Sequence, residues 1–341
     1  MVLVTASFQA VLSAKRKDDR LVLSNGDQLI GEIKKLEHGA LFFKSDFMLD
    51  TSQVDWTRVR ELQSLDLYQI FLTNGLQFVG TIHRFADGRF VIDGAGPGVP
   101  ADLTWADVAI ILPRERSFWA QLQGNVSSGF SYTSGNSQTQ WSLTGQVIYP
   151  GDRMTLGLSG SSTFSGQSGG TSTSRNVAAL TDEITFKRNW FALALIELLQ
   201  SQQQDLDLRT TAGGGVGRFL FRTGRTSFVG FGGLVYTHED YAAPTDPANP
   251  NSNINDNLES VFGLDFATYR FKTTQLTARY SVYPSLSTLG RVRMAATSYL
   301  NFEIAHNLYW SFSLYENYDS KPPVNANKND FGVTNSIGWK F

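Results

Sequence analysis

Apolar and polar residues alternate along most of the chain after residue 117, as they do in β-strands that have one apolar face. The last run is the clearest, because it alternates to the final residue through Phe331, Val333, Asn335, Ile337, Trp339 and Phe341. Similar amphipathic segments lie near residues 118–133, 137–149, 153–164, 174–187, 190–200, 206–221, 226–238, 257–271, 274–284, 290–304, 307–318 and 330–341. They predict a 12-stranded antiparallel transmembrane β-barrel over residues 117–341, and an even strand number is usual for single-chain bacterial barrels.

The junctions between these segments alternate between short and long. Tight turns are predicted at residues 150–152, 187–189, 222–225, 272–274 and 305–307. Longer polar junctions include residues 165–173, 242–257 and 320–329. Short periplasmic turns and long extracellular loops are typical of outer-membrane barrels.

Aromatic residues gather beside the predicted short turns, where a membrane-interface girdle is expected. They are Tyr149, Phe186, Trp190, Phe221, Phe228, Phe271, Trp310, Trp339 and Phe341. The terminal aromatic Phe341 also resembles the signal that the barrel-assembly machinery recognises. A soluble β-sandwich or solenoid is the competing architecture, although shorter strands at even spacing would be usual for it.

Residues 20–112 contain an internal repeat with an offset of 49, so they hold two copies of one unit. Identical pairs are Leu23/Leu72, Asn25/Asn74, Gly26/Gly75, Gln28/Gln77, Gly31/Gly80, Ile33/Ile82, Gly39/Gly88, Trp56/Trp105 and Val59/Val108. Each Asn-Gly pair predicts a two-residue hairpin turn with positive φ at both positions. About five short strands in each unit predict two small SH3-like or Sm-like β-barrel repeats, with each tryptophan in a core.

These features divide the chain into residues 1–19, a signal-peptide remnant or linker; residues 20–64 and 65–113, the two β repeats; and residues 117–341, the barrel. The first 14 residues are apolar and small but lack the positive charge that begins a signal peptide. The chain has no cysteine and no apolar run long enough for a transmembrane helix.

Charge and motifs exclude several function classes. With 29 Lys+Arg and 31 Asp+Glu, the chain lacks the basic excess of nucleic-acid-binding proteins, so an Sm-like RNA-binding role is disfavoured. The sequence has no Gly-x-Ser-x-Gly, no His-Glu-x-x-His and no metal-ligand spacing. His238 and His306 fall at opposite ends of predicted strands, and His38 and His83 are not equivalent in the repeat. We therefore expect no enzymatic activity, no cofactor and no metal.

If the apolar face of each strand faces lipid, charged residues of the other face point into the lumen, where they must be hydrated or paired. They are Glu183, Asp265, Arg279, Arg291, Arg293 and Glu303, accompanied by Tyr269, Tyr283, Tyr299, Tyr309 and Tyr315. Neighbouring opposite charges, such as Asp265 and Arg279, can pair along the wall. Two interpretations stay open: a constricted channel with charge selectivity, or a salt-bridged plug that stabilises the barrel.

The strand series from about residue 118, with Asp330-Phe331-Gly332 at the start of its closing strand, resembles a family of salt-induced outer-membrane proteins, a domain of unknown function. The stretch Asn25-Gly26-Asp27-x-Leu29-x-Gly31-Glu32-Ile33 resembles the small β domain that precedes such barrels in some members. This resemblance implies an outer-membrane barrel with a periplasmic N-terminal domain and no catalytic residues to transfer.

The sequence thus predicts an integral outer-membrane β-barrel that acts as a narrow channel or an envelope-integrity protein. The alternative is a membrane-anchored interaction scaffold, in which the periplasmic repeats bind a partner protein or self-associate. Expected partners are outer-membrane lipid and the assembly machinery, with no nucleic acid.

Overall fold

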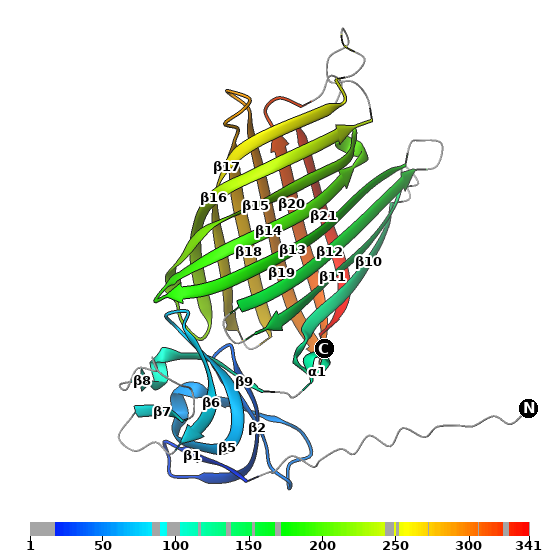
Figure 1. The fold of residues 1–341 in the computed structure, drawn as a ribbon. Coiled ribbons are helices and arrows are strands. Elements are labelled where there is room, and N and C mark those ends of the chain that lie inside the picture. The colour runs from blue at the N-terminus through cyan, green and yellow to red at the C-terminus, as the bar shows by residue number, and fades with distance from the viewer. Residues whose placement is uncertain are drawn as a thin grey trace, which may run out of the picture.

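The computed structural model describes residues 18–83, 89–93, 103–114, 117–133, 138–151, 154–167, 172–242, 249, 252–271, 273–305, 307–322 and 327–340. Within these residues the chain folds into a small N-terminal β module and a closed β-barrel, which lie end to end (Figure 1). The proposed signal-peptide remnant before residue 18, His306 and the terminal Phe341 lie outside the described residues. No helix of the described part is long and apolar enough to cross a membrane.

The barrel consists of strands β10 to β21, each paired antiparallel with the next, and it closes where β21 pairs with β10. Its strands are β10 (Gln123–Thr133), β11 (Gln138–Pro150), β12 (Met154–Gln167), β13 (Thr173–Lys187), β14 (Trp190–Ser201), β15 (Leu206–Arg222), β16 (Thr226–Tyr241), β17 (Ile254–Phe271), β18 (Thr274–Pro284), β19 (Val292–Ala305), β20 (Leu308–Asp319) and β21 (Asn329–Lys340). A 3₁₀ turn, η3 (Gln202–Gln204), joins β14 to β15. The predicted 12-stranded antiparallel barrel is confirmed.

The first predicted barrel strand began too early. Residues Phe118–Gln121 form the short helix α1, and β10 begins at Gln123. Two adjacent aromatic residues in a strand would point to opposite faces, which would direct one of them into the polar lumen. The helix instead keeps Phe118 against Tyr149, with ring centroids 4.8 Å apart, and leaves Trp119 exposed at the rim of the barrel.

The outer surface of the barrel is apolar around its circumference. Exposed side chains there include Leu143, Leu158, Leu180, Ile196, Leu220, Leu234, Leu258, Phe262, Leu314 and Ile337. Exposed aromatic side chains near the end that faces the module include Phe186, Trp190, Phe221, Trp310 and Trp339. An apolar band with an aromatic girdle and a polar interior is typical of a membrane-spanning barrel.

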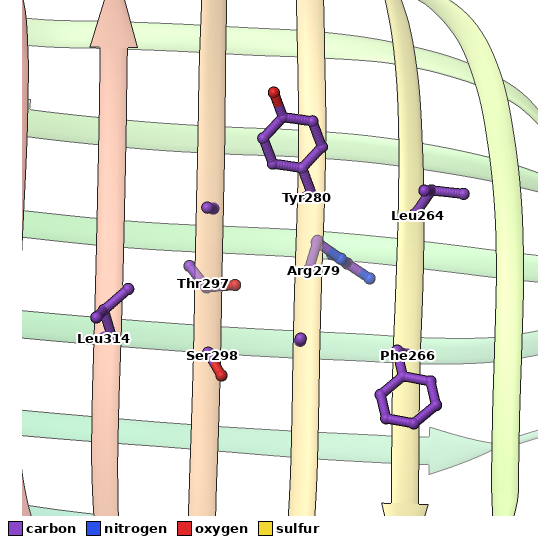
Figure 2. Close-up of a pocket in the computed structure, with 9 residues that line it drawn as sticks. Leu264, Phe266, Arg279, Tyr280, Thr297, Ser298 and Leu314 are labelled. Atoms are coloured by element: carbon purple, nitrogen blue, oxygen red, sulfur yellow. The ribbon is translucent and has the colours of Figure 1, made fainter.

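This surface carries a shallow groove of about 280 Å³ on strands β17 to β20. Figure 2 shows it between larger side chains, including Leu264, Phe266, Tyr280 and Leu314. The small residues Ala278 and Ala296 leave the depression. Its position in the apolar band makes it part of the face that contacts lipid.

The N-terminal module is a sheet with the order β4-β3-β2-β1-β5-β6-β7-β8, and β9 pairs with both β2 and β5. Its elements are β1 (Asp19–Leu23), β2 (Gln28–Glu37), β3 (Ala40–Lys44), β4 (Ser52–Asp55), η1 (Trp56–Arg58), β5 (Val59–Leu72), β6 (Gln77–His83), β7 (Arg89–Asp93), β8 (Leu103–Thr104), η2 (Trp105–Asp107) and β9 (Val108–Pro113). A continuous apolar core with side chains from both repeat units includes Leu21, Ile33, Leu41, Phe43, Leu62, Ile70, Ile82 and Ile111.

Strand β5 belongs to both repeat units. Its first half pairs with β1, so that Leu21 opposes Leu62, and its second half pairs with β9, so that Ile70 opposes Ile111. These two pairs are related by the offset of 49. Equivalent residues also touch: the Trp56 Nε1–H donates to the Trp105 carbonyl at 2.9 Å. Contacts between equivalent positions place an approximate two-fold axis between the units. The SH3-like or Sm-like assignment stays a prediction.

The prediction of a two-residue hairpin turn was wrong. Residues 24–27 connect β1 to β2, and Gly26 has a positive φ of 91° whereas Asn25 does not. The Asn25 side chain instead accepts the backbone N–H of Asp27 at 3.1 Å, which stabilises a longer turn. The second unit repeats this arrangement, with a φ of 83° at Gly75.

We expect unheated protein in mild SDS to migrate differently from boiled protein, because a closed sheet has no edge strand from which to unravel. The measurement is semi-native gel electrophoresis of detergent-purified protein. Identical migration of the two samples, together with solubility in the absence of detergent, would contradict a membrane-spanning closed barrel.

Candidate functional site in the barrel lumen

The barrel lumen is lined by the polar residues that alternate with the apolar outer residues. The proximal end of the lumen is the one that faces the N-terminal module, and the distal end is the opposite one. Strands β10, β12, β14, β16, β18 and β20 run from the proximal to the distal end, and the other six return (Figure 1). The two ends and the centre differ in how their charges are buried.

At the distal end, the guanidinium of Arg291 lies between two carboxylates. Its Nη1 and Nη2 donate to Glu239 at 2.7 and 3.0 Å, and its Nε donates to Asp319 at 3.1 Å. Arg209 adds a second cation to Glu239, with Nε 2.7 Å from Oε1. Paired, bidentate geometry of this kind gives the strongest charge-assisted hydrogen bonds.

A second arginine, Arg293, pairs with Glu259 beside this group. Its Nε donates to Glu259 Oε1 at 2.9 Å, and its Nη2 bonds to Glu259 Oε2 and to Thr237 Oγ1. Arg293 lies on β19 and Glu259 on β17, so the pair spans the intervening strand β18. Both side chains are buried.

We call Arg209, Glu239, Glu259, Arg291, Arg293 and Asp319 the distal network. It contains three cations and three anions, and each of these side chains is at most 9% exposed. Its members lie on strands β15, β16, β17, β19 and β20 and on the β18–β19 loop. Charges withdrawn from water this far are stable only when each has a partner. The distal network therefore closes this part of the lumen with paired charges.

The centre of the lumen carries a smaller charged group. Arg279 on β18 donates from Nε and Nη2 to Asp265 on β17, at 2.6 and 2.8 Å. The predicted pairing of these two residues is present. Glu183 and Arg222 lie within electrostatic range of each other, and Glu183 is also in range of Asp265 and Arg279.

Unlike the distal network, the centre is accessible to water. The Arg279 side chain is 58% exposed although it points away from the apolar outer face that Tyr280 and Ala278 share (Figure 2). Gln146, which is cross-strand from the lumen residue Asn125, is also exposed. The barrel thus encloses a polar space below the distal network that is wide enough for water to reach these side chains.

The N-terminal module lies against the proximal end through the turn between β2 and β3. The His38 ring at this turn stacks on Tyr269 of β17, with ring centroids 3.4 Å apart and planes 15° apart. The adjacent Gly39 packs against the side chain of Arg225, which forms an ion pair with Asp55 at 3.5 Å. This turn belongs to the first repeat unit.

The second repeat unit contacts the same end through its Asn-Gly turn. The Asn189 N–H donates to the Asn74 carbonyl at 2.6 Å, and Gly75 packs against the ring of Phe219. The Gln69 amide donates to the Gly151 carbonyl at 2.6 Å. The module therefore reaches strand ends and turns from β11 to β17 around the proximal mouth.

The structure separates the six residues predicted to line the lumen. Glu183, Asp265 and Arg279 come together in the centre, whereas Arg291 and Arg293 lie in the distal network. Glu303 lies near the proximal end of β19, where it is exposed, and no ion pair among the described residues involves it. Whether these residues govern passage through the barrel stays a prediction.

Four members of the distal network were missed: Arg209, Glu239, Glu259 and Asp319. Two of them lie beyond the predicted strand ends at residues 238 and 318, because polar residues near a strand end resemble a loop. Arg209 and Glu259 fall inside predicted strands on the inward-facing alternation. That alternation could have identified them. Among the described residues, no cluster of three or more histidine and acidic side chains could hold a metal ion.

Replacing Glu239 with glutamine should destabilise the barrel by about 3–5 kcal/mol, because two buried arginines then lose a shared carboxylate. The matched control is Glu303→Gln, an exposed position where we expect a change within about 0.5 kcal/mol. Chemical unfolding in lipid vesicles measures both. Equal stability of the two variants would show that the distal network does not support the fold.

The comparisons with known proteins concern the barrel. The NanC porin is similar at 10% identity and a TM-score of 0.40, covering 64% of this chain and 98% of that chain. An outer membrane channel from Pseudomonas putida F1 is similar at 14% identity and a TM-score of 0.38, covering 64% and 95%. The DcaP channel of Acinetobacter baumannii has 10% identity and a TM-score of 0.31, covering 95% and 94%. These likenesses are distant, and the geometry above stands without them.

Among curated proteins, none matches the sequence. Residues 126–341 match the family model described as a protein of unknown function, DUF481. This region runs from within β10 to the end of the chain. The association with salt-induced expression stays a prediction. Because the match spans more than half of the chain, the protein belongs to the DUF481 family.

Proposed function

We propose that this chain is an integral outer-membrane β-barrel that forms a narrow, gated channel, with its N-terminal module in the periplasm. The proximal end then faces the periplasm and the distal end faces the outside of the cell. Short turns at the proximal end support this orientation. No catalytic step is part of the proposal.

The observation that carries it is the contrast between the centre and the ends of the lumen. Arg279 is well exposed inside the barrel, whereas the side chains of the distal network are almost fully buried. In a barrel that served only as an anchor, side chains could fill the lumen along its whole length. A hydrated centre between two polar closures instead suits a path that opens when one of the closures rearranges.

The distal network itself favours a second candidate function. Its buried, balanced charges connect six positions on neighbouring strands and a loop. Such a network is expected in a barrel whose lumen is blocked and which only anchors the periplasmic module in the membrane. In that case the periplasmic module would bind a partner protein or a second copy, and the barrel would contribute to envelope integrity. Conductance of the purified protein separates the two candidates.

In planar lipid bilayers we expect stepwise currents whose ion selectivity depends on the central pair. Arg279→Gln should shift the reversal potential toward cation selectivity, and Asp265→Asn should shift it toward anion selectivity. A unit charge about 8 Å from a permeating ion in water contributes about 0.5 kcal/mol, with opposite sign for a cation and an anion, so the cation-to-anion permeability ratio should change about fivefold in each variant. A folded, heat-modifiable barrel without current at any voltage or pH would leave the scaffold as the function.

Deleting Phe341 should reduce the amount of folded barrel in the outer membrane, because the terminal aromatic is the expected assembly signal. The matched control is Phe331→Leu, which changes an exposed aromatic residue on β21. Membrane fractionation followed by semi-native electrophoresis measures the folded barrel in each strain. Equal levels in the two strains would show that Phe341 is an ordinary strand residue.

A further inference from the structure

The contact between the N-terminal module and the barrel includes the titratable imidazole ring of His38. His38 has a φ of 56° at the tip of the β2–β3 turn, and its imidazole lies on Tyr269 with most of its surface covered. Stacking at 3.4 Å between ring centroids leaves no room for a hydration shell between the two rings. An imidazolium is more strongly hydrated than a neutral imidazole, so this docked position favours the neutral form of His38.

The charges around His38 reinforce this preference. Glu37 lies 3.4 Å from His38 Nε2 and favours protonation, but its other oxygen already accepts the Lys35 ammonium at 2.7 Å. Lys340 on β21 and Lys35 on β2 both oppose protonation of the ring. On the β15–β16 turn, Arg225 packs against Gly39 and pairs with Asp55. Burial is the largest cause, and together these effects lower the pKa of His38 to about 4.

We propose that the β2–β3 turn is an acid-sensitive contact: protonation of His38 breaks its contact with the proximal end of the barrel and releases the N-terminal module. The other contacts of the module are compatible with release, because they are few: single hydrogen bonds, an exposed ion pair, and the packing of Gly39 against Arg225 and of Gly75 against Phe219. The module moves away as a folded body, since its apolar core lies within it.

The direction of the pH effect follows from linkage. In the released module His38 is exposed and has an ordinary pKa of about 6.5. Because the pKa of His38 is lower in the docked state, docking is strongest above pH 6.5. It weakens progressively as the pH falls from 6.5 to 4 and changes no further below that. Between pH 7.5 and pH 5 the docking equilibrium constant should fall by about 30-fold. Burial raises the pKa of Glu37, but His38, Lys35 and Lys340 together hold it below its ordinary value of 4.5, so this carboxylate stays charged at pH 5.

The test measures the distance between module and barrel directly in the full chain. Because the sequence has no cysteine, Asp50→Cys on the module and Arg188→Cys on a proximal turn give two specific spin-label sites. Double electron–electron resonance in lipid nanodiscs then reports the distribution of distances between the two spin labels at pH 7.5 and pH 5. We expect one narrow distribution at pH 7.5 and an added broad, longer component at pH 5.

The informative variant is His38→Asn, because asparagine tolerates the left-handed backbone at this position and carries no titratable group. It should keep the narrow distribution at both pH values. The matched control is His83→Asn, which removes an exposed histidine of the other repeat unit that pairs with Asp93. This control should respond to acid as the parent does. His38→Lys, with a permanent charge, should show the longer component even at pH 7.5.

An unchanged distribution in the parent between pH 7.5 and pH 5 would overturn the inference. So would an acid response in His38→Asn equal to that of the parent. Heat-modifiable migration of each variant confirms that its barrel is folded. The readout does not depend on conduction: acid release without current would end the channel proposal alone, and current without acid release would end this inference alone.

Discussion

The fold depends on one constraint: a backbone that crosses hydrocarbon must satisfy all its hydrogen bonds within the protein. Pairing of β21 with β10 meets it by closing the sheet, so that no barrel strand is left as an edge. Closure also fixes which residues face inward, because side chains alternate along each strand, apart from the register shifts near strand ends. The polar lumen is therefore a direct result of closing an amphipathic sheet in lipid.

Within that lumen, the cost of burying charge determines where water remains. Near the distal end, Arg291 reaches from a loop to carboxylates on strands β16 and β20, and the balanced network excludes solvent. In the centre, Arg279 has one carboxylate partner and keeps contact with water. The proximal end is covered by a separate folded unit, which contacts it through a ring stack, an exposed ion pair, single hydrogen bonds and a few packing contacts of turn glycines. The distal end is thus filled by side chains of the barrel itself, whereas the proximal end is covered by the N-terminal module through a small contact surface.

The sequence predicts what alternation and local register determine. Twelve strands follow from the alternation, and the Asp265–Arg279 pair follows from adjacent strands. The Arg293–Glu259 pair could not be predicted in the same way, because its partners are two strands apart and depend on the curvature of the closed barrel. The docking of the module was also hidden, since its contacts are polar turns without an apolar signature. Adjacent aromatics at residues 118 and 119 were an unused sign of the helix before β10.

The duplication inside the module has an evolutionary consequence. The two Asn-Gly turns are copies, yet Gly75 is enclosed by Phe219 of the barrel whereas a side-chain atom at Gly26 would meet nothing within 4 Å. An internal two-fold axis offers two similar faces, but a single barrel can occupy only one of them. Docking therefore constrains one copy of the turn, and the barrel leaves the other copy uncovered. Internal duplication has supplied the chain with a spare surface on which new recognition can arise.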